Sequence, residues 1–373
     1  MRASIAARGQ DEYGPRQRPT GKAADALAIG IDNNAGPALA IVSVNARSQM
    51  PMTTATPPTD MSPPPVADAP RDNWVDAHAP ESWRPYLRLA RADRPIGTWL
   101  LLFPCWWSLC LASIASGRPY PNPWHLLLFA IGAFAMRAAG CAYNDFIDRD
   151  YDAMVARTMS RPIPSGQISP RNALIFVALL GLVGLVVLLQ FNTFTIWLAI
   201  ASLALVLVYP FMKRLTNWPQ LVLGLAFNWG ALVGWSALMQ SLALPALALY
   251  AGCVLWTLGY DTIYAHQDKE DDLMLGLKST ALHFGPATAT WVGGFYLGAL
   301  VLWGLACLVA GAHLVTFVAL VVVGLHFAWQ VSGLDIDDAG NCLLRFRANR
   351  NVGYMLFAGL LADMAISWAS GVA

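Results

Sequence analysis

Two clusters of acidic and amide side chains, each placed just after a long apolar stretch, carry the chemistry that this sequence can perform. The first cluster lies within residues 144–152 and the second within residues 261–272. Carboxylates are costly close to lipid, so clusters in these places indicate a functional site. Helical spacing predicts that members three, four or seven positions apart share one face of a helix. The in-phase residues are Asn144, Asp148 and Asp152 in the first cluster and Asp261, Asp268 and Asp272 in the second.

Hard oxygen ligands of this kind suit Mg²⁺, which takes one or two carboxylates together with phosphate and water oxygens. Two facing clusters therefore predict a pair of Mg²⁺ ions with a diphosphate between them. The predicted metal ligands are Asn144, Asp145, Asp148, Asp152, Asp268, Asp271 and Asp272. The alternative is that these are solvated loop charges, which the in-phase spacing of two separate clusters disfavours.

Basic side chains near the clusters are suited to the phosphate groups of such a ligand, because a guanidinium group offers forked donors. The predicted diphosphate-binding residues of this kind are Arg149, Arg157, Arg161 and Lys278. Their alternative role is to set the membrane orientation and to contact lipid head groups. The sequence leaves that alternative open.

The composition places these clusters in a membrane protein. Hydrophobic residues make up 56% of the chain and charged residues 13%, whereas a soluble domain carries about 25% charged residues. The formal net charge of +1 gives no reason to expect a nucleic-acid partner. No obligate protein partner is indicated, and membrane lipid is the expected surrounding.

Nine stretches are long and apolar enough to cross a bilayer, which takes about 20 residues. The sequence therefore predicts an all-α, polytopic membrane protein. The predicted spans are 96–116, 123–144, 172–191, 194–212, 219–240, 244–265, 288–310, 313–331 and 352–370.

Basic residues gather in alternate loops, which predicts the orientation of the spans. The loops that hold both acidic clusters are basic, whereas the opposite loops hold only Arg118. This pattern predicts an active site that faces the cytoplasm and a C-terminus on the other side. The expected location is the inner membrane of a bacterial cell. The alternative is the mitochondrial inner membrane, with the site facing the matrix.

Residues 1–80 differ from the rest of the chain. Proline, alanine and small polar residues dominate them, a composition that predicts a disordered tail. The nine-helix domain is predicted for residues 81–373. Two alternatives for the tail are a mitochondrial presequence and an over-long gene model whose true start is Met61.

Three stretches of the sequence can be compared with known motifs: RADRPIGTWLLLFPCWW (91–107), NDFIDRDYDAMVARTMSRPIPSG (144–166) and DTIYAHQDKEDDLMLGLKSTA (261–281). They resemble the UbiA family of intramembrane prenyltransferases, and most closely its 4-hydroxybenzoate polyprenyltransferase branch. The resemblance implies a ring of nine helices around a central cavity, a polyprenyl diphosphate donor, Mg²⁺ and a lateral opening for the lipid tail. It also places Tyr264, which belongs to the second motif, with the diphosphate-binding residues.

The resemblance implies transfer of the polyprenyl group to 4-hydroxybenzoate, at the ring carbon ortho to the hydroxyl, in ubiquinone biosynthesis. Asp261 is the expected base, and Arg94 or Arg137 is the expected partner of the acceptor carboxylate. Other acceptors of the family, such as a naphthoate, haem or a chlorophyll precursor, remain alternatives. A secondary transporter is the alternative from another class, but transporters place ionisable residues near mid-membrane, where this chain has few apart from Arg137.

Overall fold

The structure is a computed structural model that describes residues 69–70 and 72–371. Most of the predicted tail, residues 1–68, lies outside the described residues. The first helix, α1 (Trp74–His78), begins before the predicted boundary at residue 80. Asn73 caps this helix by accepting a hydrogen bond from the backbone N–H of Asp76 at 3.0 Å. Helical structure therefore starts earlier than the predicted domain 81–373, and α2 (Arg84–Leu89) follows.

Every regular element within the described residues is a helix, and nine helical segments there are long and apolar enough to cross a membrane. This confirms the predicted fold class. The uninterrupted segments are α3 (Ile96–Ala115), α4 (Pro123–Asp152), α5 (Pro170–Leu188), α14 (Leu314–Ser332) and α15 (Ala339–Ala369). The interrupted segments are α6 (Thr193–Val208) with α7 (Met212–Leu215), α8 (Pro219–Phe227) with α9 (Gly230–Met239), α10 (Leu244–Ala265) with α11 (Lys269–Met274), and α12 (Thr280–Phe284) with α13 (Thr288–Ala310).

Two helices are longer than their apolar stretches predicted. Helix α4 continues to Asp152, well past the predicted end at residue 144. Helix α15 begins at Ala339, where Asp338 accepts hydrogen bonds from two backbone N–H groups. Three basic residues that precede the predicted last span at 352–370, Arg345, Arg347 and Arg350, therefore lie on α15 and not in a loop. An apolar stretch indicates only the part of a helix that lipid surrounds. The helix itself can continue into polar sequence, because its backbone hydrogen bonds do not depend on apolar side chains.

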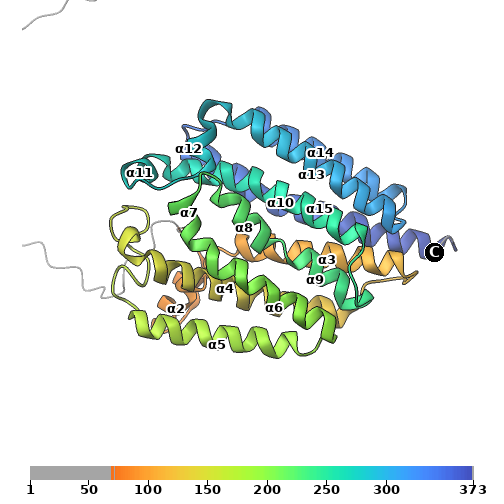
Figure 1. Cartoon of the computed structure of the whole chain (residues 1–373), viewed down its shortest axis with the longest axis horizontal. Coiled ribbons are helices and arrows are strands. Elements are labelled where there is room, and N and C mark those ends of the chain that lie inside the picture. Colours follow the sequence, from red (N-terminus) through yellow and green to blue (C-terminus); the bar gives the residue numbers. More distant parts are fainter. Residues whose placement is uncertain (1–68, 71, 372–373) are drawn as a thin grey trace, which may run out of the picture. The chain divides into compact units, whose positions relative to one another are not determined.

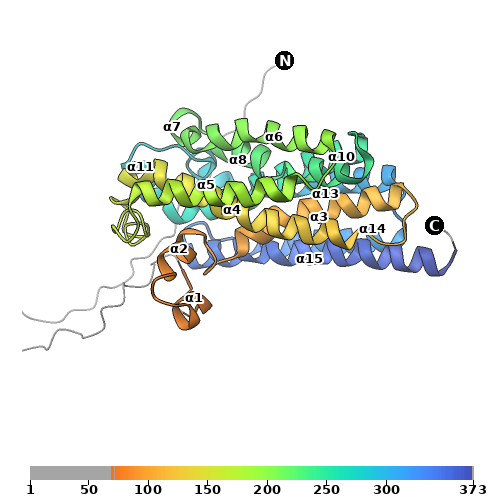
Figure 2. The same ribbon diagram turned by 90° about the horizontal axis from the view of Figure 1, so that it is seen from below.

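The helices form a ring that α15 closes by packing against α3. Contacts run from α3 to α4 and from α4 to α5, and α6 packs against α8 and α9. These two pack against α10, and further contacts lead through α13 and α14 to α15. Helices α7, α11 and α12 lie at one end of the bundle, and the C-terminal end of α15 lies at the other (Figure 1). Figure 2 shows α1 and α2 beside the bundle at the same end as α7 and α11.

The core of the bundle is aromatic on one side of the ring. Trp107, Trp256 and Trp303 are fully buried, and their ring centroids lie 5.1–5.6 Å apart in tilted or edge-to-face pairs. Such pairs contribute about 0.5–1.5 kcal/mol each beyond their buried area. The indole N–H of Trp256 donates to Asn349 Oδ1 at 2.7 Å, so its polar group is satisfied. This packing fixes α3, α10 and α13 with respect to one another, and α10 carries Asp261, the first residue of the second acidic cluster.

Candidate functional site

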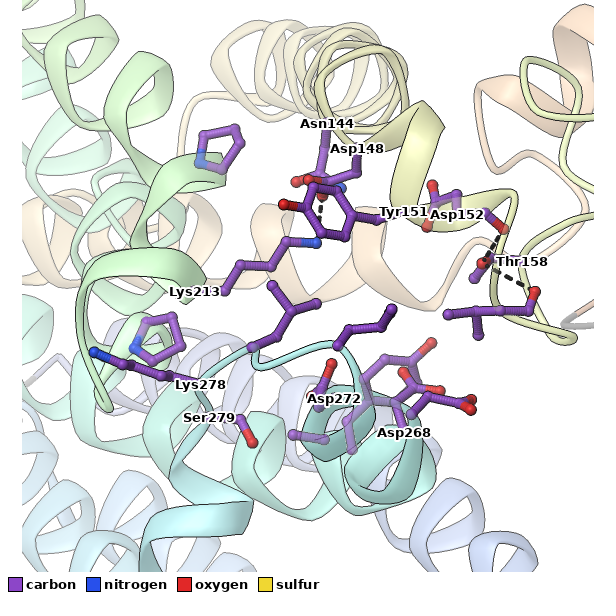
Figure 3. A pocket seen from close by; sticks show the side chains of 18 of the residues that line it. Asn144, Asp148, Tyr151, Asp152, Thr158, Lys213, Asp268, Asp272, Lys278 and Ser279 are labelled. Carbon is purple, nitrogen blue, oxygen red and sulfur yellow. Dashed lines mark hydrogen bonds and ion pairs between the residues drawn. The ribbon is translucent and has the colours of Figure 1, made fainter.

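A cavity of about 230 Å³ lies at the end of the bundle where α4 and α10 finish (Figure 3). One wall is the last turns of α4 with the loop that follows. A second wall is the turn after α6 together with α7 and the start of α8. The third wall is the end of α10 with α11. The charged residues that line the cavity are Asp148, Asp152, Arg157, Arg161, Lys213, Asp261, Asp268, Asp271, Asp272 and Lys278.

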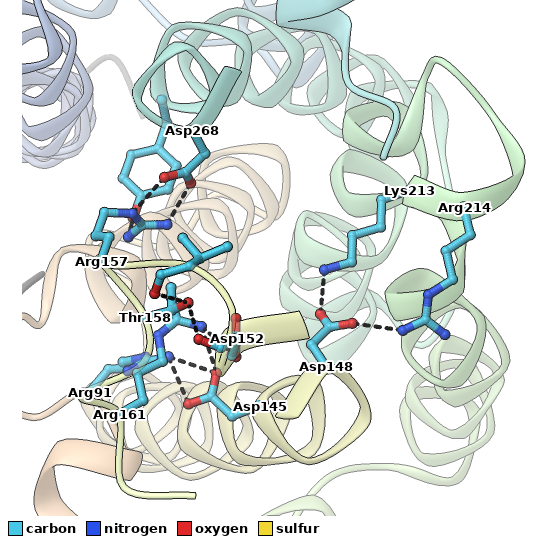
Figure 4. Close-up of polar contacts among 12 residues, drawn as sticks. Arg91, Asp145, Asp148, Asp152, Arg157, Thr158, Arg161, Lys213, Arg214 and Asp268 are labelled. Carbon is cyan, nitrogen blue, oxygen red and sulfur yellow. Dashed lines mark hydrogen bonds and ion pairs between the residues drawn. The ribbon is translucent and has the colours of Figure 1, made fainter. Parts of the chain in front are cut away.

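Helix α4 presents the first cluster to the cavity as its spacing predicted. Asn144, Asp148 and Asp152 follow one another at intervals of four and all line the cavity. The Asp148 carboxylate is 2% exposed and lies 2.7 Å from Lys213 Nζ and 3.0 Å from Arg214 Nη2 (Figure 4). Two cations from the second wall therefore hold a buried carboxylate of the first wall.

Two residues of the first motif do not line the cavity as predicted. Asp145 accepts hydrogen bonds from Arg91 and Arg161 on another side of α4 (Figure 4). Arg149 is partly exposed, donates to the Phe146 carbonyl and lies 3.6 Å from the exposed Asp150. Both residues are one position away from a cavity-lining residue, and one position on a helix is a rotation of about 100°.

The second cluster reaches the cavity by a different local structure from the one predicted. Helix α10 ends at Ala265, a 3₁₀ turn follows at His266–Asp268, and α11 begins at Lys269. The prediction of one continuous helical face was therefore wrong in its geometry. His266 is buried in this turn and hydrogen-bonds Thr288 at 3.0 Å, which ties the turn to α13. All the predicted members still line the cavity: Asp261, Tyr264, Asp268, Asp271 and Asp272.

Arg157 connects the loop after α4 to the second cluster. Its Nε and Nη2 donate to the two oxygens of Asp268 at 2.6 and 2.5 Å, and Nη1 donates to Tyr264 OH at 3.4 Å (Figure 4). Burial lowers the pKa of Arg157, but the nearby Tyr264 and Asp268 raise it by more. The pKa of Arg157 therefore lies above its ordinary value. Arg157 therefore stays a cation at the mouth of the cavity.

The predicted base and a nearby cation lie on the spanning helices α10 and α4. Asp261 lines the cavity, and Arg137 on α4 lies within electrostatic range of it. The guanidinium of Arg137 also lies over the Phe227 ring, 5.3 Å from its centroid. Arg94, the other candidate for the acceptor carboxylate, lies 3.2 Å from Asp93. Neither arginine is among the residues that line the cavity.

Sequence reasoning missed Lys213 and Arg214 as site residues and treated them only as loop charges. The signal was their position at the end of an apolar span, on the same side of the membrane as both acidic clusters. It likewise counted Arg91, which belongs to the stretch that carried the resemblance, only among the basic residues that set the orientation. Which of these cations faces a carboxylate depends on how α4 and α7 pack, and one sequence does not contain that information.

Carboxylates and cations from three helical walls, at one end of a membrane-spanning ring, define an intramembrane protein with a polar site for a compact anionic ligand. The sequence pattern of the UbiA prenyltransferase family matches residues 101–358. The chain therefore belongs to the UbiA prenyltransferase family.

Known proteins of this kind resemble the chain in sequence and in structure. It is 49% identical over 282 residues to the "4-hydroxybenzoate polyprenyltransferase, mitochondrial" of Aedes aegypti, and the match covers 74% of this chain and 63% of that protein, less than two thirds of its length. The apo structure of a UbiA homolog from Aeropyrum pernix K1 is similar with a TM-score of 0.60 and 27% identity, covering 71% of this chain and 98% of that one. A UbiA homolog from Archaeoglobus fulgidus bound to GPP and Mg²⁺ shares the fold with a TM-score of 0.58 at 19% identity, covering 75% and 99%.

Proposed function

We propose that this chain transfers a polyprenyl group from a polyprenyl diphosphate to 4-hydroxybenzoate, at the ring carbon ortho to the hydroxyl, and releases diphosphate. The proposed role is a step of ubiquinone biosynthesis. The names of the relatives support the substrates. The observation that carries the proposal is one cavity whose walls supply both carboxylates and cations, with the partly buried Asp261 among the lining residues.

The cations of the cavity are suited to the diphosphate of the donor. Lys213 and Arg157 come from opposite walls, and Arg161 and Lys278 line the same cavity. A guanidinium group binds phosphate oxygens through forked donors, and an ammonium group acts as a point charge. A diphosphate between the walls would therefore contact cations on both sides.

The donor set also fits Mg²⁺. Oxygen-bearing side chains on two walls line the cavity: Asn144, Asp148, Asp152, Asp268, Asp271 and Asp272. Among the residues that the structure describes, no three acidic, histidine or cysteine side chains converge closely enough to hold an ion by themselves. Each ion would therefore take one or two of these carboxylates and complete its coordination with phosphate and water oxygens. When bound there, Mg²⁺ would supply charge neutralisation for the leaving diphosphate.

The acceptor belongs at the inner part of the cavity. We assign its carboxylate to Arg137, because Arg137 lies within electrostatic range of Asp261, whereas Arg94 lies against the carboxylate of Asp93. A charge-assisted hydrogen bond from a guanidinium is a strong interaction for a carboxylate. This arrangement would place the acceptor ring between the donor and Asp261.

The proposed reaction balances through these groups. The allylic C–O bond of the donor breaks, and its electron pair stays on the diphosphate, whose charge Lys213 and Arg157 stabilise. The ring carbon of the acceptor supplies the electron pair of the new C–C bond, and the proton on that carbon leaves to the Asp261 carboxylate. Apolar side chains such as Val155, Leu275 and Leu277 line the cavity and would help to keep water from the allylic cation.

The chain is a multi-pass membrane protein, and we propose that it lies in an inner membrane with the cavity on the side of the basic loops. The relative from Aedes aegypti is named mitochondrial. That name favours the matrix side of the mitochondrial inner membrane over the bacterial inner membrane expected first.

Product analysis tests the proposed function. Membranes that contain the chain would receive a mixed pool of polyprenyl diphosphates with Mg²⁺ and either 4-hydroxybenzoate, a naphthoate, or a haem or chlorophyll precursor. The expected result is a prenylated 4-hydroxybenzoate by mass, with one diphosphate released per product. Prenylation of another acceptor alone would assign a different branch, and absence of diphosphate release with every acceptor would reject the transferase.

A further inference from the structure

Gly97, in the first turns of α3, lies against the guanidinium of Arg137 from α4. A Cβ atom on Gly97 would lie 2.5 Å from Arg137 Nε, 2.7 Å from Nη2 and 2.8 Å from Cζ. Non-bonded carbon atoms have their optimal separation at about 3.5–4.0 Å. The guanidinium therefore occupies space that any residue other than glycine would fill at this position.

The other neighbours of Arg137 leave this guanidinium without a hydrogen bond at Nε. Nε is buried and has no hydrogen-bond partner among the described residues. The Phe227 ring contacts one side, through a cation–π contact of 5.3 Å, and the charge of Asp261 lies within electrostatic range. Packing therefore helps to set the position of the Arg137 guanidinium, which fills the space beside Gly97 and lies over the Phe227 ring.

We propose that Gly97 is a positioning residue that determines acceptor specificity. By leaving space on α3, it allows Arg137 to stand where it binds the carboxylate of the aromatic acceptor. The proposal rests on the proposed function and adds a position on a different helix that neither contacts the substrate nor carries a charge. It predicts that the missing side chain at Gly97, in the first span, favours acidic acceptors over neutral ones.

The kind of contact at Gly97 makes this role separable from helix packing. At Gly353 an added Cβ would lie 2.0 Å from the Phe103 ring, and at Gly234 it would lie 2.4 Å from the backbone oxygen of Cys105. Those neighbours are rigid, so a substitution there would disturb the fold. At Gly97 the neighbour is the far end of a flexible side chain, which can move aside. Gly97→Ala is therefore expected to leave the bundle folded and to displace the guanidinium of Arg137.

The test compares Gly97→Ala with a matched control in membranes that contain the full chain. The control is Gly184→Ala on α5, where the added Cβ would lie 2.6 Å from Met136 Sδ. Met136 is the neighbour of Arg137 in sequence but carries no charge. The acceptors are 4-hydroxybenzoate and its neutral amide, and the KM of each is measured along with the KM of the polyprenyl diphosphate.

Gly97→Ala is expected to raise the KM for 4-hydroxybenzoate about 10- to 150-fold, the range for a lost charge-assisted hydrogen bond. The KM values for the amide and for the polyprenyl diphosphate are expected to stay within about twofold, as are all values for Gly184→Ala. An unchanged KM for the acid, or an equal rise for the acid and the amide, would overturn the proposal. If wild-type membranes prenylate the amide but not the acid, the proposed function itself fails, which is a separate outcome.

A double-mutant cycle keeps the test independent of any folding defect in Gly97→Ala. Arg137→Ala removes the atoms with which the new Cβ would collide, so the double variant has room for both alanines. Residues that act through one contact are not additive in such a cycle. Gly97→Ala is therefore expected to change the acceptor KM by less than about twofold in the Arg137→Ala background. A full effect of Gly97→Ala in that background would show that it acts by another route and would overturn the proposal.

Discussion

Arg91 donates from Nη2 to both carboxylate oxygens of Asp145, at 2.7 and 2.8 Å. Arg91 has a φ of 58°, a left-handed conformation that is uncommon for a residue other than glycine and that persists where surrounding contacts hold it. Arg161 adds a second contact to Asp145 at 3.2 Å and also lies 3.0 Å from Asp152. Asp145 thereby links the segment before α3 to the loop after α4, outside the cavity.

This relationship predicts that Asp145 acts on stability and not on metal binding. In Asp145→Asn, Arg91 and Arg161 both lose the charge of Asp145, while Arg161 keeps its contact with Asp152. Removing one partner of a buried ion pair costs about 3–5 kcal/mol. We expect a lower unfolding temperature and an unchanged half-saturating concentration of Mg²⁺. Asp150→Asn is the control, because Asp150 belongs to the same stretch but its side chain is 79% exposed. If Asp145→Asn is stable but needs more Mg²⁺ for half-saturation, Asp145 is a metal ligand, as the sequence predicted.

Activity is expected to require Mg²⁺ and the cavity-lining carboxylates. Asp148→Ala and Asp268→Ala should each reduce kcat/KM on the order of 10²-fold or more, as when one stabilising group is removed from a developing charge. Chelation with EDTA should abolish turnover, and added Mg²⁺ should restore it. Full turnover in excess EDTA would contradict the assignment of a metal to this cavity.

Lys213 is expected to bind the donor, although sequence reasoning did not select it. Lys213→Ala should raise the KM for polyprenyl diphosphate about tenfold or more, because a charged hydrogen bond contributes about 1.5–3 kcal/mol. The KM for 4-hydroxybenzoate should not change. Arg149→Ala is the control, since Arg149 was predicted from sequence but lies outside the cavity lining. Equal effects of the two substitutions on the donor would place the diphosphate elsewhere.

The two arginines expected at the acceptor carboxylate are predicted to differ. Arg137→Ala should raise the KM for 4-hydroxybenzoate about 10- to 150-fold, and Arg94→Ala should raise it less, because Arg94 lies against Asp93. The KM for the donor should move little in either variant. Steady-state kinetics with each substrate varied in turn provides the measurement. A larger rise of the KM for 4-hydroxybenzoate in Arg94→Ala than in Arg137→Ala would assign the acceptor carboxylate to Arg94 instead.

The docking of α1 is expected to weaken in acid. Arg88 donates to Asp76 Oδ1 from Nε at 3.0 Å and from Nη2 at 2.8 Å. Burial raises the pKa of Asp76, but hydrogen bonds from Asn73 and Arg88 outweigh it and hold the pKa below its ordinary value of 3.8. A lowered pKa stabilises the folded form above that ordinary value, and this stabilisation is lost as the pH falls through the lowered pKa.

Hydrogen exchange of the α1 backbone measures this loss. Protection should be constant from neutral pH to about pH 4 and should fall below it. Asp76→Asn should show reduced protection already at neutral pH, because the charge opposite Arg88 is gone. Protection of α1 that is the same in Asp76→Asn as in wild type would show that this ion pair does not hold the helix.

The sequence by itself determined the class of protein, the number of spans and the two clusters. These follow from local properties: the length of an apolar stretch, and the spacing that places Asn144, Asp148 and Asp152 on one helical face. Both depend on residues near one another in the chain. Helix ends were less predictable, because α4 and α15 continue beyond lipid where polar side chains find partners.

Only the tertiary structure decided which charges meet. Asp145 and Asp148 are three positions apart and chemically identical, yet one lies against Arg91 and Arg161 and the other against Lys213 and Arg214. The partners are far away in sequence, so their proximity depends on the rotation and depth at which α4 packs against its neighbours. The contact at Gly97 also depends on helix packing. The missing side chain on α3 matters only because the Arg137 side chain from α4 fills the space. Side-chain packing between helices sets these positions, and local sequence patterns do not encode it.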